Sequence, residues 1–197
     1  MRTLWMLVLG AAFLCSGCAG GPKTRETPAE GARTVYARCN LKVLGHRRIP
    51  WKNWQSVPEI IPVGTRLELS GGSTNWDLRD PETGRVYTLE AGAAGEKYLS
   101  KWVRETPLAM DFPPSVVANV EKQIAVVGMT REQVFVSMGP PTIADGTKSY
   151  RLTEEQVFKT RSWVYARRRF GKNIGVVFSP TTGLVISTEG IWKKSAP

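Results

Sequence analysis

Histidine and cysteine are scarce in this chain of 197 residues, which holds one histidine and three cysteines. The histidine, His46, lies in the basic run Gly-His-Arg-Arg. We expect an exposed loop residue there rather than a catalytic base. The sequence lacks H-E-x-x-H, zinc-type Cys/His spacing, G-x-S-x-G and the P-loop. These absences predict a protein that is not an enzyme, with no catalytic residues, no metal site and no cofactor.

Long apolar runs are also missing, apart from one at the N-terminus. Residues 4–14 read LWMLVLGAAFL, follow the basic tip Met-Arg-Thr, and precede the small residues of Cys-Ser-Gly-Cys. This order is typical of a secretory signal peptide. The run is far shorter than the roughly 20 residues of a membrane-spanning helix, which argues against an uncleaved anchor.

The cysteine that closes this segment, Cys18, makes it resemble a bacterial lipoprotein signal. The resemblance implies that the Cys18 thiol receives a diacylglyceryl group, that residues 1–17 are removed, and that the new N-terminus is acylated, with palmitate-type chains in the membrane. Ala19 and Gly20 follow in place of the Asp that marks inner-membrane retention, which favours the periplasmic face of the outer membrane. The alternative is an ordinary secreted protein cleaved nearby.

Acidic residues are few beside the 27 lysines and arginines: there are 17, and the formal net charge is +10. A basic excess suits anionic surroundings such as lipid head groups, peptidoglycan or an acidic protein, and a solvated surface without a specific partner is the alternative. Nucleic acid is not expected as a partner of an exported lipoprotein. Once Cys18 is acylated and Cys15 is removed, only Cys39 remains, so we expect no intramolecular disulfide.

The first half of the mature chain is predicted to be a tether followed by a β-rich domain. Residues 18–33 are rich in Gly, Ala, Pro and charge, which predicts a flexible tether. Residues 34–106 contain several short strand candidates, with a hairpin turn at 80–84, and predict a small all-β, barrel-like domain. A short helix is expected at 96–104. The prolines of 107–114 predict a linker.

Two helices are predicted after the linker. The first runs from Ser115 to a stop at Gly128, and its apolar face is formed by Val116, Val117, Val120, Ile124 and Val127. The second begins at a capping box in which Thr130 and Gln133 satisfy each other's backbone amides. It ends at Met138, because Gly139 and the two prolines after it cannot continue a helix.

Three antiparallel strands are predicted to follow at 160–169, 173–179 and 184–191. No secondary structure is predicted for residues 142–159, apart from a turn at Asp145-Gly146 and a helical turn that begins at Thr153. The predicted fold class is α+β, in which the β-domain precedes a module of two helices and a three-stranded sheet at 115–192.

The motif Val-Gly-Met-Thr-Arg-Glu-Gln-Val at 127–134, followed by Met-Gly-Pro-Pro at 138–141, resembles the signature of the BamE/SmpA/OmlA lipoprotein domain. Trp-Val-Tyr at 163–165 and the strand Gly-Val-Val-Phe at 175–178 match its later pattern. The residues that shape the motif are Gly128, Met129, Thr130, Gln133, Val134, Gly139 and Pro140. The resemblance implies an α+β module that binds other proteins at the outer membrane, as the accessory subunits of the β-barrel assembly machine do.

Two groups of residues are candidates for binding. The predicted hairpin near residue 165 gathers cations and aromatic rings that suit an acidic protein or a lipid phosphate: Arg161, Trp163, Tyr165, Arg167, Arg168 and Arg169. The alternative there is a solvated hairpin end with buried aromatics. Trp51, Trp54 and Trp76 suit a ligand platform, or else the core and rim of the β-domain.

The signal and the motif together predict a lipid-anchored cell-envelope protein that acts as a non-enzymatic protein-interaction module. Its expected partner is an outer-membrane or periplasmic protein, in outer-membrane protein assembly or envelope integrity. The alternative is a lipoprotein that binds peptidoglycan or another ligand through the N-terminal β-domain.

Overall fold

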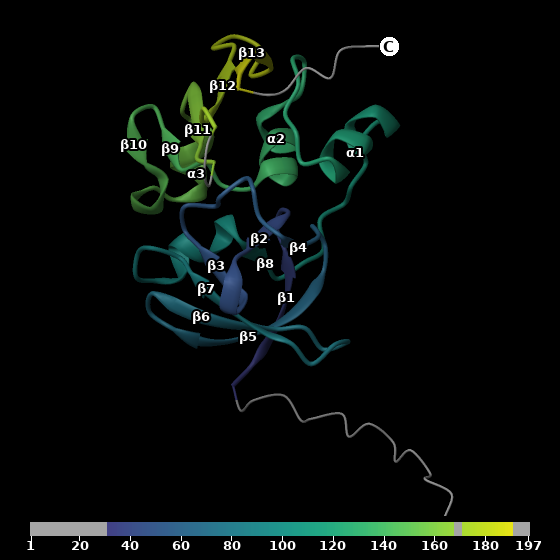
Figure 1. Ribbon diagram of the computed structural model, residues 1–197, viewed down its shortest axis with the longest axis vertical. Coiled ribbons are helices and arrows are strands. Elements are labelled where there is room, and N and C mark those ends of the chain that lie inside the picture. The colour runs from purple at the N-terminus through teal and green to yellow at the C-terminus, as the bar shows by residue number, and fades with distance from the viewer. Residues whose placement is uncertain (1–30, 168–170, 191–197) are drawn as a thin grey trace, which may run out of the picture.

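The computed structural model describes residues 31–167 and 171–190. Within them the chain forms a curled six-stranded sheet, a five-stranded antiparallel sheet and a separate pair of strands, with helices beside the second sheet (Figure 1). The mixed α/β character agrees with the predicted class. Cys18, Arg168 and Arg169 lie outside the described residues.

The six-stranded sheet contains most of the N-terminal half and has the order β3-β7-β6-β5-β1-β8. Its pairs are antiparallel except for β3 and β7, which are parallel. Its strands are β1 (Arg33–Ala37), β3 (Arg48–Pro50), β5 (Arg66–Gly72), β6 (Asn75–Arg79), β7 (Val86–Glu90) and β8 (Val103–Arg104). The separate pair is β2 (Leu41–Val43) with β4 (Glu59–Ile61).

Alternation along these strands explains why they form a sheet with one buried face. In β6, Trp76 and Leu78 are buried and their neighbours are not, and β7 repeats the pattern. The predicted hairpin between β6 and β7 is confirmed: Asp80 Oδ1 accepts from the Glu82 amide at 2.9 Å, and Gly84 takes the left-handed φ of 69°. The short helices of this half are the 3₁₀ turns η1 (Gly45–Arg47) and η2 (Glu96–Lys101).

The five-stranded sheet has the order β10-β9-β11-β12-β13. Its strands are β9 (Ile143–Ala144), β10 (Thr147–Lys148), β11 (Ser162–Tyr165), β12 (Ile174–Phe178) and β13 (Val185–Glu189). The helices of this half are α1 (Pro114–Glu121), α2 (Arg131–Met138), η3 (Ser149–Arg151) and α3 (Glu154–Phe158). The prediction of three strands and two helices was therefore incomplete, because residues 143–158 add two strands, the 3₁₀ turn η3 and the helix α3, which begins at the helical turn expected from Thr153.

The helix boundaries follow local chemistry. The predicted capping box of α2 is confirmed, with Thr130 accepting from the Gln133 amide, and α3 has a second box at Thr153 and Gln156. The first helix is shorter than predicted, since α1 ends at Glu121 and Gln123 has a left-handed φ of 57°. Val127 therefore does not continue the buried face of α1, and it is 64% exposed.

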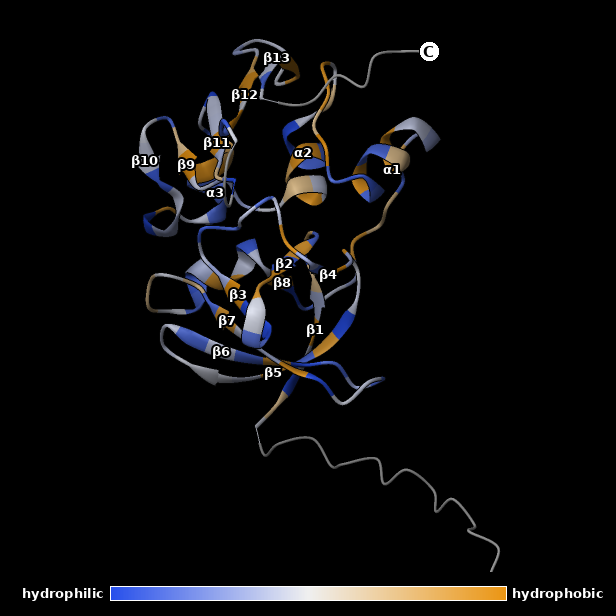
Figure 2. Ribbon diagram, in the orientation of Figure 1, coloured by the Kyte–Doolittle hydropathy of each residue, from blue (hydrophilic) through white to orange (hydrophobic). Residues whose placement is uncertain are grey.

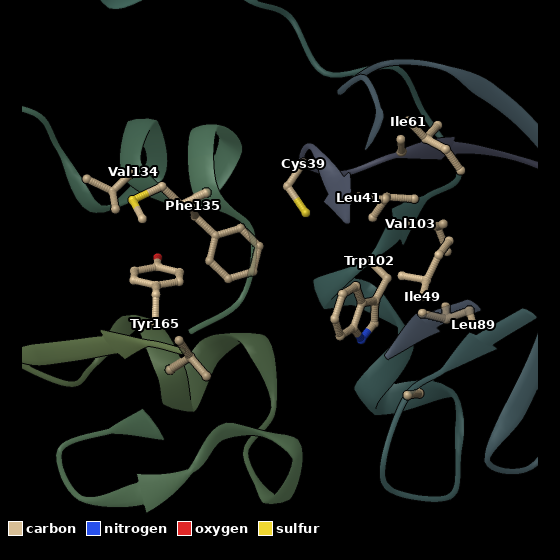
Figure 3. Close-up of a cluster of buried hydrophobic side chains, with 14 of the residues drawn as sticks. Cys39, Leu41, Ile49, Ile61, Leu89, Trp102, Val103, Val134, Phe135 and Tyr165 are labelled. Carbon is tan, nitrogen blue, oxygen red and sulfur yellow. The ribbon is translucent and has the colours of Figure 1, made fainter. Parts of the chain in front are cut away.

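One apolar core runs through both halves of the chain. Cys39 lies between Leu41 and Trp102 of the N-terminal half and Phe135 and Tyr165 of the C-terminal half (Figure 3). Residues 107–113 contain no helix or strand. The two predicted domains thus share a core across their boundary.

Hydrophobic residues gather along α2 and on the strands that face it (Figure 2). In the part of the chain that is described, no helix has the length and apolarity needed to cross a membrane.

Candidate interaction surface

A buried arginine links the two halves of the molecule. Arg38, directly after β1, is 3% exposed; its Nη2 donates to Glu132 of α2 at 2.7 Å and its Nε donates to Glu154 of α3 at 3.0 Å. It also lies 5.0 Å from the ring centroid of Phe135. Burial alone would lower the pKa of Arg38, but the two carboxylates outweigh it and raise the pKa. This ion triad is structural, because both carboxylates are occupied by the arginine.

Two buried lysines make further contacts between the halves. Lys101 donates to the backbone oxygens of Ser149 at 2.7 Å and Leu152 at 2.6 Å, and Lys42 donates to the Gln123 side chain. Burial lowers the pKa of each lysine to about 8. Their contacts are with carbonyl and amide oxygens of the fold, which gives them a packing role.

Cys39 and His46, the cysteine and the histidine of residues 31–167 and 171–190, lie in a buried and an exposed position. Burial raises the pKa of Cys39 to about 12, so its thiol stays protonated. His46 is exposed, as predicted. No cluster of three or more His, Cys, Asp or Glu residues able to hold a metal ion occurs in this part of the chain.

The prediction that Trp163 and Tyr165 form part of an exposed binding surface on the β11 hairpin is wrong. Trp163 and Tyr165 are fully buried, because they point to the inner face of the sheet, toward α2. The Trp163 Nε1 donates to Thr160 Oγ1 at 2.8 Å, and the Tyr165 hydroxyl donates to the Gly139 carbonyl at 3.1 Å. Arg161 is exposed and Arg167 is half-buried, so the alternative of buried aromatics holds.

The tryptophans of the N-terminal half are core and rim residues. Trp76 is buried, whereas Trp51 and Trp54 are half-buried. The Lys52 ammonium lies 5.8 Å and 5.2 Å from the ring centroids of Trp51 and Trp54. The chain's own cation therefore occupies the neighbourhood where a ligand would stack.

Most motif residues act as predicted, but Gly128 does not end a helix, because α1 ends at Glu121. Met129 and Val134 are buried, and the Gly128 amide donates to the Val185 carbonyl at 2.9 Å. Gly139 has a φ of 78°, and beside it the Asn53 amide donates to the carbonyls of Met138 and Pro140. The motif thus shapes the end of α2 and its contact with the N-terminal half.

The strand register shows which residues lie on the outer face of the five-stranded sheet, the face that points away from α2. Directly paired residues share a face, and one row across the sheet reads Lys148, Ile143, Val164, Gly175 and Glu189. Val177 and Ser187 pair on the same outer face. We call this set of residues the outer face.

Exposed apolar side chains gather where the outer face meets its β13 edge. Among the described residues, four large apolar side chains are exposed, and three of them are Val127, Val177 and Ile186. The pairing register shifts beside Val177, which leaves Ile186 as an extra, 55% exposed residue of β13. Gly128 and Met129 form backbone hydrogen bonds with Val185, which brings Val127 to the same edge. We call these three residues the apolar patch; the hydrophobic colouring of the loop before α2 and of β12 and β13 is visible in Figure 2.

The sequence contained a signal for only part of this patch. The alternation of Ile174, Val176 and Phe178 leaves Val177 on the opposite face, which was readable in advance. The exposure of Ile186 depends on a bulge, and the exposure of Val127 depends on the early end of α1. Neither feature has a local sequence signature.

None of the protein-family models, curated proteins or solved structures compared with this chain matches it. The resemblance to the BamE/SmpA/OmlA domain therefore rests on the motif residues alone and stays a prediction.

Proposed function

We propose that this protein is a lipid-anchored component of the bacterial cell envelope that binds another protein and catalyses no reaction. Cys18 is the proposed lipid attachment site, at the periplasmic face of the outer membrane. The proposal rests on the signal-like segment and the motif of residues 127–141, together with one structural observation. That observation is the apolar patch, which holds three of the four exposed large apolar side chains of the described residues, on segments that are hydrogen-bonded to one another.

The patch supports a docking role because apolar surface that stays in water has an unfavourable free energy of hydration. Val127, Val177 and Ile186 come from three separate segments, so their proximity requires the folded sheet and loop. The fourth exposed residue, Val86, lies on β7 of the other sheet and stands apart. The patch is small, and it fits the apolar centre of a contact whose rim is polar.

The partner we propose is an outer-membrane or periplasmic protein, in keeping with the motif's resemblance to accessory subunits of the barrel-assembly machine. Co-purification from membranes tests this, with the full chain carrying an affinity tag. We expect an outer-membrane protein to co-purify with the wild type and with Val86→Asp, and to be lost with Ile186→Asp.

Both substitutions place a carboxylate at an exposed valine or isoleucine of a strand, which makes Val86→Asp a matched control. Recovery of no outer-membrane protein with the wild type would overturn the proposal. Equal recovery with Ile186→Asp and Val86→Asp would overturn the assignment of the patch.

A further inference from the structure

The residues in the middle row of the outer face are arranged so that the row is complementary to a reversed copy of itself. Across the sheet it reads Lys148 on β10, Ile143 on β9, Val164 on β11, Gly175 on β12 and Glu189 on β13. β11 is the central strand of the five, so the two charges lie two strands to either side of Val164. Adjacent strands lie about 4.8 Å apart, which separates the two charged positions by about 19 Å along the row.

Both terminal charges of the row are exposed and have no ion-pair partner among the described residues. Lys148 and Glu189 are exposed, and neither takes part in any of the salt bridges of the fold. Glu189 bends over the sheet, with Oε2 3.9 Å from the position that a Cβ of Gly175 would occupy. An unpaired carboxylate beside a half-buried apolar row is suited to an incoming cation.

We infer that the outer face binds the outer face of a second copy of this chain, with a two-fold axis that runs along β11. Such an axis reverses the row, so Lys148 of one copy faces Glu189 of the other. Ile143 then faces Gly175, where the missing side chain leaves room for it, and Val164 faces Val164. The Lys148–Glu189 and Ile143–Gly175 contacts each occur twice and the Val164 pair lies on the axis, as an isologous interface requires.

The dimensions of packed sheets allow this arrangement. Two sheets that pack face to face lie about 10 Å apart, a gap that a lysine and a glutamate side chain bridge together. The Glu189 side chain leaves Gly175 when it turns toward the second copy, and the same movement opens the gap for Ile143. The inference deepens the proposed function and rests on it, because the outer face shares Val177 with the apolar patch and a second copy is one of the protein partners that this surface binds.

Gly175 provides the sharpest test, because a side chain added there points to the second copy and makes only ordinary contacts with Glu189 of its own chain. Its φ lies outside the left-handed region, and an added Cβ would meet Glu189 Cβ at an ordinary 3.6 Å. The added Cβ of Gly175→Val therefore has room within the chain, and we expect its two methyl groups to fill the gap opposite Ile143. A charge exchange gives a second test, because Lys148→Glu and Glu189→Lys each create two like-charge contacts in the dimer, whereas the double variant restores both pairs.

Sedimentation equilibrium of the purified full chain in density-matched detergent measures the association. We expect a reversible dimer that weakens about tenfold in each single charge variant, and about a hundredfold in Gly175→Val. The double charge variant should return to within about threefold of the wild type. Lys122→Glu, an exposed lysine beyond α1, is the control and should leave the association unchanged.

A wild type that stays monomeric at every concentration would overturn the inference, as would a double charge variant no tighter than the singles. Circular dichroism melting of each variant shows that the fold is retained. The sedimentation experiment tests only the dimer. The proposed function is tested separately, by the protein that co-purifies with the chain and by its loss in Ile186→Asp.

Discussion

The side-chain amide of Asn53 lies directly beside Gly139, the glycine that ends α2. Asn53 Nδ2 donates to the carbonyls of Met138 and Pro140 at 2.7 Å each, and a Cβ on Gly139 would lie 2.7 Å from that nitrogen. The glycine is thus required both by its φ of 78° and by the close approach of Asn53. Through this contact the loop after β3 holds the end of α2 in place.

Gly139→Ala is expected to destabilise the protein by at least about 2 kcal/mol, because the methyl group meets Asn53 and the backbone conformation is strained for alanine. Urea unfolding measures the loss. The control is Gly84→Ala, at a φ of 69° with nothing within 4 Å of the added Cβ, which should cost about 1 kcal/mol. Equal losses in the two variants would show that the Asn53 contact is not the cause.

Loss of both carboxylates around Arg38 is expected to cost about 3 kcal/mol or more, because a buried guanidinium is left without its counter-charges. The double variant Glu132→Ala with Glu154→Ala tests this in urea. The control is Glu90→Ala, which breaks the pair with Arg48 at a similar distance of 2.6 Å, but Arg48 is 52% exposed. That change should cost less than about 1 kcal/mol. A double variant as stable as the control would contradict the structural role of the ion triad.

Lys42 should make the protein more stable as the pH rises from neutrality. Burial lowers its pKa to about 8 in the folded chain, against 10.5 in the unfolded chain. Between these values the unfolded chain binds more protons, so the free energy of unfolding rises with pH, by about 2 kcal/mol from about pH 7.5 to about pH 10.

Lys42→Met removes this contribution, so the stability of the wild type relative to the variant should increase over that range. Raised pKa values of Cys39 and Tyr165 act in the opposite direction, since the unfolded chain loses those protons first. Both residues are present in the two proteins, and their effects cancel in the difference. A difference that is flat or falls with pH would contradict the lowered pKa of Lys42.

Cys39 should be unreactive in the folded protein. Its thiol is fully buried, it donates to the Lys101 carbonyl at 3.8 Å, and its pKa is raised to about 12. In a chain that begins at residue 19 it is the sole cysteine. We expect no reaction with a colorimetric disulfide reagent in buffer at about pH 8, and one reactive thiol per chain in urea. Rapid labelling in buffer would show that the core around Cys39 opens readily.

Local chemistry accounts for what could be predicted from the sequence. The capping box of Thr130 and Gln133 joins residues three apart, and the turn at Asp80 closes within five residues, so both were readable. The pairing partners of Arg38 and Lys101 lie 48 to 116 residues away, and no pattern in the sequence indicated them. The sequence correctly predicted that Trp163 and Tyr165 share one face of a strand. Whether that face is buried or exposed to solvent depends on α2.

The most direct test of the docking surface is site-specific photo-crosslinking in intact membranes, with a photoreactive side chain at position 186 and, as the control, at position 86. Both positions are exposed and apolar, at 55% and 42% exposure. We expect a discrete crosslinked band containing a second protein from position 186 and none from position 86. Equal crosslinking from both positions, or none from position 186, would contradict it.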